Sequence, residues 1–145
     1  MTELITVMVI VGILAAIVAP KFFDRGTFDS RGFYDQTIAT LRYAQKAAIS
    51  QRRLVCVTFP SNTRVVLRTA ANFTDTSCNP DLQNPSGSYP LGVTTYTIDA
   101  PAGVTLSGQA DFNFDALGRP SAAQSISVSD YVTAIRVVAE TGYVH

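Results

Sequence analysis

The feature that most constrains this chain is an uninterrupted apolar run near its start, from Leu4 to Pro20 (LITVMVIVGILAAIVAP). The run carries no charged residue, and its only hydroxyl belongs to Thr6. As a helix that rises about 1.5 Å per residue, it is roughly 25 Å long, slightly less than a hydrocarbon core of about 30 Å. Phe22 and Phe23 would extend it into the membrane interface. Because no polar stripe runs along it, we expect this helix to be buried on all sides, in lipid or against other helices.

Three interpretations of the apolar run compete. A cleaved secretory signal starts with basic residues, whereas this chain has Glu3 and places Pro20 directly after Ala19, the only candidate cleavage residue. A plain membrane anchor leaves Glu3 unexplained, because an acid at the edge of a membrane segment is costly unless it is paired. A helix that leaves the membrane and packs against copies of itself accounts for Glu3 as a pairing group. It also accounts for small residues at helical spacing, which let helices approach closely: Gly12, Ala15, Ala16 and Ala19. Pro20 removes a helical donor, which predicts either a deformable point or the end of this helix.

The rest of the chain predicts an α+β head. Gly26 suggests a break, and Asp29 or Ser30 is a candidate N-cap for a helix over about residues 30–53. Its apolar face comprises Tyr34, Ile38, Leu41, Ala44 and Ala48, with Gln36, Thr40, Arg42 and Gln51 largely elsewhere. Residues 54–145 are β-rich, beginning with runs at 54–59 and 63–69 joined by a hairpin at Pro60-Ser61-Asn62. Further short strands are expected at 94–99, 104–107, 111–115, 125–128 and 132–139, and residues 70–93 predict a long surface loop.

These elements predict two parts, a hydrophobic helix over residues 1–26 and a globular head over residues 27–145. The long N-terminal helix is expected to continue into the amphipathic helix, which packs on an antiparallel β-sheet or sandwich.

Composition argues against several classes of function. The net charge is zero, and the two cysteines and the single histidine, His145, form no cluster with metal-site spacing. No phosphate-binding loop and no catalytic triad is evident, so we expect no enzyme activity, no metal and no cofactor.

Charge is nevertheless unevenly distributed along the chain. Residues 36–74 hold six basic residues and no acid, whereas residues 75–145 hold seven acids and two bases. The basic segment includes a candidate patch for DNA or a protein partner, made of Arg52, Arg53, Arg64 and Arg68. Solvated surface charges and complementary faces on neighbouring copies are the alternatives. Nucleic-acid binding is the weaker interpretation, because the chain has no net positive charge.

The segment MTELITVMVIVGILAAIVAPKFF resembles the N-terminus of type IV pilins and type II secretion pseudopilins. Those chains place a glutamate near the helix start and a proline about seventeen residues later, the spacing of Glu3 and Pro20 here. The segments DSRGFYDQTIATLRYAQKAAISQRRLVCVTF, NFDALGRPS and ETGYVH extend the resemblance to H-type minor pseudopilins, DNA-uptake pilins and mannose-sensitive haemagglutinin-type pilins. The resemblance covers most of the chain and is weakest between residues 70 and 110.

This resemblance implies the pilin fold and a structural role. Subunits would reside in the bacterial inner membrane as single-pass proteins and then polymerise into an extracellular filament or a periplasmic pseudopilus, for adhesion, motility or uptake. The implied partners are other copies, the assembly machinery and a prepilin peptidase, and N-terminal methylation is implied as well. Glu3 would meet the N-terminal amine of a neighbour, with Gly12, Ala16 and Pro20 serving helix packing. The alternative is a minor pilin or pseudopilin that primes assembly or acts in secretion or DNA binding.

The N-terminus departs from the family in one respect. Family members carry a short basic leader, and the mature glutamate follows four residues, whereas only Met1 and Thr2 precede Glu3. We therefore expect this sequence to begin about two residues inside the mature chain, and no residue is assigned as the processing site.

Cys56 in a predicted strand and Cys78 in the predicted loop are candidates for a disulfide, because a head outside the cytoplasm lies in an oxidising compartment. The alternative is a buried free thiol at Cys56 and an exposed one at Cys78.

Overall fold

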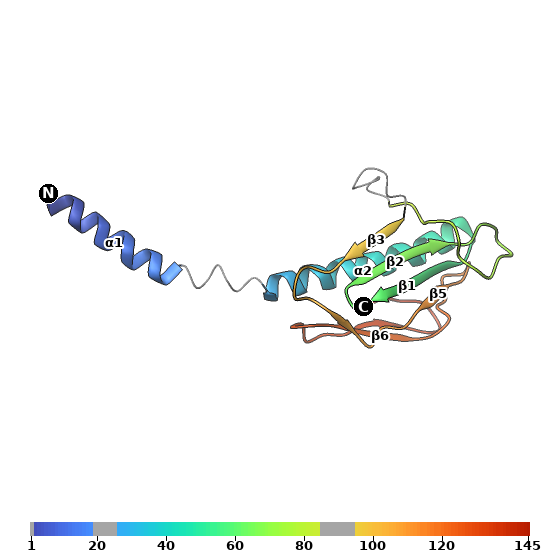
Figure 1. Ribbon diagram of the computed structural model, residues 1–145. Coiled ribbons are helices and arrows are strands. Elements are labelled where there is room, and N and C mark those ends of the chain that lie inside the picture. Colours follow the sequence, from blue (N-terminus) through green and yellow to red (C-terminus); the bar gives the residue numbers. More distant parts are fainter. Residues whose placement is uncertain (1, 19–25, 85–94) are drawn as a thin grey trace.

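The computed structural model describes residues 2–18, 26–84 and 95–145 (Figure 1). Within these ranges the chain forms two helices followed by seven strands. They are α1 (Thr2–Val18), α2 (Gly26–Gln51), β1 (Val55–Ser61), β2 (Arg64–Thr69), β3 (Tyr96–Asp99), β4 (Leu106–Ser107), β5 (Phe112–Phe114), β6 (Gln124–Val128) and β7 (Ile135–Val137). The predicted α+β class is confirmed. The predicted continuity of the two helices and the boundary near residue 26 involve residues 19–25, outside the described residues.

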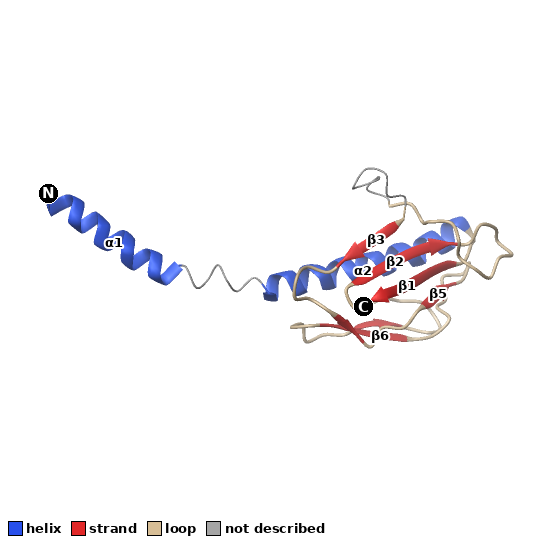
Figure 2. Ribbon diagram, in the orientation of Figure 1, coloured by secondary structure: helices blue, strands red, loops and turns tan. Residues whose placement is uncertain are grey.

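Helix α2 belongs to the head and lies along one face of the strands (Figure 2). At about 1.5 Å per residue its 26 residues span roughly 39 Å. The side chains that it buries recur at three- and four-residue steps: Ser30, Phe33, Tyr34, Thr37, Thr40, Leu41, Ala44, Ala47 and Ala48. The predicted face is therefore largely confirmed, but the prediction that Thr40 lies largely away from it is wrong. Thr40 is tolerated inside because its hydroxyl lies 3.3 Å from the hydroxyl of Tyr96.

Helix α2 begins about one turn earlier than predicted. Because it starts at Gly26, Asp29 and Ser30 lie within the helix and neither is its N-cap. Asp29 stands in the first turn, where an acid interacts favourably with the helix dipole. The Ser30 hydroxyl is buried without a hydrogen-bond partner among the described residues.

Helix α2 ends close to the predicted position. The Arg53 amide donates to the Ala48 carbonyl at 3.2 Å, and the Arg52 amide donates to the Ile49 carbonyl at 3.4 Å. This is the bonding pattern of a Schellman cap, which requires one residue in the left-handed region. Arg52, with φ of 52°, occupies the position where glycine is usual.

A four-stranded antiparallel sheet, in the order β3-β2-β1-β5, packs on α2. The predicted β1–β2 hairpin is confirmed, but its turn is Asn62-Thr63, because β1 extends through Pro60 to Ser61, which pairs with Arg64. The register shifts between Thr58 and Ser61. Proline at such an irregularity removes no regular ladder bond.

A second antiparallel sheet, in the order β4-β6-β7, completes the head. The core lies between α2 and the two sheets, and its largest fully buried side chains include Phe33, Leu41, Phe114, Ile126 and Ile135. Alternation of buried and exposed residues in these short strands reflects one face packed on the core and one facing solvent.

The segment that follows β2 is more buried than the predicted surface loop. Within its described part, residues 70–84, Leu82 is 2% exposed and belongs to the core. The Thr69 amide donates to the Pro80 carbonyl, and the Tyr96 amide donates to the Leu82 carbonyl, both at 2.9 Å. This stretch therefore forms a layer beside the sheet; the remainder of the predicted loop, residues 85–94, lies outside the described residues.

Candidate functional site

Helix α1 exposes an apolar surface that none of the described residues of the head covers. All its described side chains, from Thr2 to Ala15, are exposed. The nine large apolar ones among them are 54–70% exposed: Leu4, Ile5, Val7, Met8, Val9, Ile10, Val11, Ile13 and Leu14. Complete burial of one such side chain is worth about 1.5–3 kcal/mol, so an apolar environment for all nine would contribute more than about 10 kcal/mol. An apolar environment would therefore stabilise this helix strongly.

The features of α1 that the sequence singled out lie on different sides of the helix. Glu3 stands in its first turn, and the Thr6 hydroxyl bonds the carbonyls of Glu3 at 2.9 Å and Thr2 at 3.2 Å. Gly12 is open, with no heavy atom within 4 Å of the position a Cβ would take. Nine residues at about 100° each place Glu3 and Gly12 on roughly opposite sides. Glu3 and Gly12 therefore face different directions around the helix.

The other predicted assembly residues are placed only in part. Ala16 lies in α1, whereas Ala19, Pro20, Phe22 and Phe23 lie outside the described residues. Across residues 2–18, 26–84 and 95–145, no helix combines the length and the apolar character needed to cross a membrane. The described residues also contain no group of three or more His, Cys, Asp or Glu side chains that could hold a metal ion.

The predicted disulfide between Cys56 and Cys78 is confirmed. Its Cα atoms are 6.0 Å apart, and it links positions separated by 22 residues. Cys56 is half-buried on β1 opposite Arg68 on β2. The bond therefore fastens the segment after β2 to the outer side of the four-stranded sheet.

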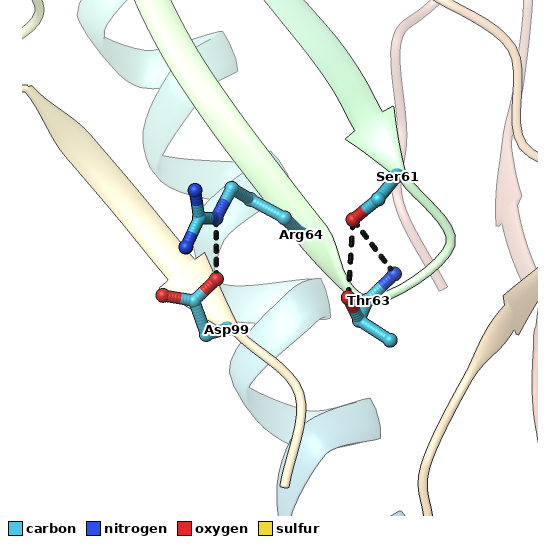
Figure 3. Close-up of polar contacts among 4 residues, drawn as sticks. All are labelled: Ser61, Thr63, Arg64 and Asp99. Atoms are coloured by element: carbon cyan, nitrogen blue, oxygen red, sulfur yellow. Dashed lines mark hydrogen bonds and ion pairs between the residues drawn. The ribbon is translucent and has the colours of Figure 1, made fainter. Parts of the chain in front are cut away.

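The four arginines of the candidate patch are divided between two places. Figure 3 shows Arg64 on β2 facing Asp99 on β3, with 2.6 Å between Nε and Oδ1. This hydrogen bond and the carboxylate charge raise the pKa of Arg64. Arg68, farther along β2, has its Nε 3.8 Å from Asp81 Oδ1. Two bases of the basic segment thus already face acids of the acidic segment within one chain.

Arg52 and Arg53 lie elsewhere, at the C-terminal end of α2. They line a cleft of about 530 Å³ together with Gln51, Asn72, Phe73 and Ala116. Phe73 is 82% exposed there. A smaller cleft of about 270 Å³ lies at the opposite end of α2, lined by Thr27, Phe28, Arg31, Asp130 and Tyr131.

Sequence reasoning missed the aromatic residues of both clefts. The available signal was an aromatic side chain without apolar periodicity around it, such as Phe73 between Asn72 and Thr74. Phe28 offered a similar signal, since it precedes the apolar face that was predicted for the helix.

Comparisons with known proteins identify the fold. No protein-family model matches the sequence, and no curated protein matches it. Two crystal structures of the Pseudomonas aeruginosa (strain PAO1) type IV minor pilin FimU are similar to the structure. The P21 form has a TM-score of 0.57 and 13% identity, over 83% of this chain and 90% of FimU. The P65 form has a TM-score of 0.51 and 15% identity, over 77% of this chain and 86% of FimU. The chain therefore has the fold of a type IV pilin, in agreement with the resemblance of its N-terminus.

Proposed function

We propose that this protein is a structural subunit of a type IV pilus-like filament, polymerising through α1. The observation that carries the proposal is the combination of a pilin-fold head with a helix whose nine described large apolar side chains are all exposed. In a filament, the helices of neighbouring subunits would cover one another, while the heads would form the outer surface.

Within such a bundle, Glu3 and the small residues of α1 have separate tasks. Gly12, Ala15 and Ala16 permit close approach of one neighbouring helix. Glu3, on the opposite side from Gly12, pairs with a positive group such as the N-terminal amine of another subunit. A carboxylate in an apolar bundle is costly alone and tolerable when paired, so this acid selects the correct axial position of an incoming subunit.

The subunit is expected to reside in the inner membrane before assembly, held by the apolar run from Leu4 to Pro20. The Cys56–Cys78 disulfide supports a head outside the cytoplasm, because disulfides persist in oxidising compartments. Other copies, the assembly machinery and a prepilin peptidase are the partners that this proposal entails. The subunit has a structural role rather than a catalytic one.

A minor subunit is the second candidate, and one specific observation favours it. Both similar structures are of a protein described as a type IV minor pilin. A minor subunit would use α1 in the same way but would occur in few copies, to prime assembly or to occupy the filament tip. Adhesion, secretion and DNA uptake are then functions of the filament to which it contributes.

Substitution of Glu3 tests the assembly role. In cells that make the filaments, Glu3→Ala should reduce the amount of this protein in sheared filaments by about tenfold or more, because an unpaired partner charge would remain in the bundle. Glu140→Ala, which removes an exposed acid of the head, is the matched control and should assemble normally. Normal assembly of Glu3→Ala with an intact head would exclude Glu3 from the mechanism.

The abundance of this protein in filaments distinguishes a major subunit from a minor one. The filament fraction of wild-type cells should contain this protein as its main component if it is a major subunit, and as a trace component if it is a minor one. Intact-mass analysis of the same fraction also reports any residues that precede Met1 and any N-terminal methylation.

A further inference from the structure

Large exposed apolar side chains of the head concentrate at its two ends. In the described part of the head these side chains are Phe28, Ile49, Phe73, Leu117, Val132 and Tyr143. Five of them lie near one or the other end of α2, which spans roughly 39 Å. Clustered exposed apolar groups of this kind mark interaction sites more often than scattered ones do.

The distal end, at the C-terminus of α2, comprises Ile49, Arg52, Arg53, Phe73 and Leu117. Leu117 belongs to it because the next residue, Gly118, lies so close to Ile49 that an added Cβ would collide with that side chain. Phe73 belongs to it because it lines the same cleft as Arg52 and Arg53.

The distal cleft is lined by two arginines and no acid. The nearest carboxylates along the chain lie outside this lining and accept hydrogen bonds from backbone amides. Asp75 accepts from the Asn72 amide at 3.0 Å, and Asp115 accepts from the amides of Leu117 at 2.9 Å and Arg119 at 2.8 Å.

The basal end, at the N-terminus of α2, comprises Phe28, Asp29, Asp130, Tyr131 and Val132. Phe28 is 80% exposed, and Val132 is fully exposed. Tyr131 is held in place by its ring contact with Tyr34, with centroids 4.2 Å apart. Asp29 and Asp130 are exposed beside these apolar groups, and Arg31 is the one base that lines the cleft.

We propose that the distal end of one copy docks on the basal end of a second copy of this chain. The inference rests on the filament role proposed above and names the contact between heads. An exposed aromatic next to two arginines would meet an exposed aromatic next to two acids and one arginine, so that both apolar burial and the net charge of each surface favour the pairing.

The geometry of one chain supports an intermolecular contact. The two ends are separated by the length of α2, so a single head cannot place its own basal end in its own distal cleft. Because the two surfaces differ, the contact is heterologous, and repetition of a heterologous contact that does not close gives an open helical filament.

Cysteine cross-linking of the full-length protein tests this contact. Both native cysteines form the disulfide and none is free, so an introduced cysteine has no competing thiol. Cells would co-express Phe28→Cys and Phe73→Cys variants with distinguishable tags. Mild oxidation would then be applied to sheared filaments and to detergent-solubilised membranes. Ser125→Cys, an exposed position on β6 that lines neither cleft, replaces Phe28→Cys in the control pair.

A disulfide-linked heterodimer of the 28 and 73 variants, in either fraction and well above the control pair, is the expected result. Its absence from both fractions, an equal yield with the control, or cross-linking only to a different protein would overturn the proposal. Incorporation into filaments is scored separately by mass. Incorporation of the chain into filaments, with the heterodimer absent from both fractions, refutes the docking alone, whereas a heterodimer in detergent without filaments refutes the filament role alone.

Charge exchange supplies a second readout. Arg53→Glu in the 73 variant should lower the heterodimer yield by about tenfold, because it places like charges opposite each other. Asp29→Arg in the 28 variant should restore most of that yield. A lower heterodimer yield that Asp29→Arg does not restore would show that Arg53 and Asp29 do not face each other, and the proposed orientation would be wrong.

Discussion

Removal of the Cys56–Cys78 bond should lower the free energy of unfolding by an amount that follows from the place of the bond in the chain. The bond closes a loop of 22 residues. Loop-closure entropy for that length gives a stabilisation of about 3 kcal/mol at 25 °C, acting through the unfolded chain. Since typical domains are stable by about 5–15 kcal/mol, the Cys56→Ala/Cys78→Ala variant should still fold but should be markedly less stable.

The native contacts of the loop determine whether this entropic value applies in full. Leu82 lies in the core, and its carbonyl accepts from the Tyr96 amide; neither contact involves the two cysteines. The native structure should therefore persist in the variant, and the loss should appear mainly as greater freedom of the unfolded chain.

Urea unfolding of the full-length protein in mild detergent measures this loss. The chain has six tyrosines and no tryptophan, so tyrosine fluorescence and near-ultraviolet circular dichroism are suitable signals. The free energy of unfolding should fall by about 3 kcal/mol, and the thermal midpoint by roughly 10 °C. Wild-type protein treated with a reductant should show the same decrease.

A decrease of less than about 1 kcal/mol, with the bond shown by mass analysis to be intact in the wild type, would refute the loop-closure argument. It would mean that the unfolded chain already keeps this segment ordered.

Four further substitutions test the packing and the pH dependence of the head. Gly142→Ala should destabilise it by about 2–4 kcal/mol in the same unfolding assay, because φ is +67° and the new Cβ would collide with a neighbouring backbone oxygen. Gly32→Ala, in open space on α2, is the control and should stabilise by about 0.5–1 kcal/mol. Ser30→Ala should be neutral or should stabilise by up to about 1 kcal/mol, since it removes a buried hydroxyl without a partner. Burial, and to a lesser degree Tyr96, raises the pKa of Tyr43 above its ordinary value of about 10. Because the folded protein binds the Tyr43 proton more tightly than the unfolded chain does, this proton contributes stability. The contribution is complete below pH 10 and is lost as the pH rises through the raised pKa. Tyr43→Phe should therefore reduce the loss of stability at alkaline pH.

The sequence predicted those features that depend on local pattern. The apolar run, Glu3 and Pro20 carried the resemblance from which the pilin fold was predicted. The amphipathic face of α2 and the β1–β2 hairpin followed from three- to four-residue and two-residue periodicity. The disulfide followed from the compartment that the resemblance implies.

The features that sequence did not predict depend on tertiary neighbours. Thr40 is buried because Tyr96 supplies a partner for its hydroxyl, and Leu82 is buried because a loop folds back beside the sheet. Strand pairing sets Arg64 opposite Asp99, which no count of charges along the chain could show. The distal cleft joins the end of α2, the loop at Phe73 and the turn at Ala116, which are far apart in sequence.

The central claim is that α1 becomes buried among other helices when the protein assembles. Met8, 70% exposed on the isolated chain, reports this directly if it is changed to cysteine. A hydrophilic maleimide applied to sheared filaments should leave Met8→Cys unmodified while it modifies Ser125→Cys on the head completely. Labelling of Met8→Cys as rapid as that of Ser125→Cys, in filaments that contain the protein, would contradict a filament core built from α1.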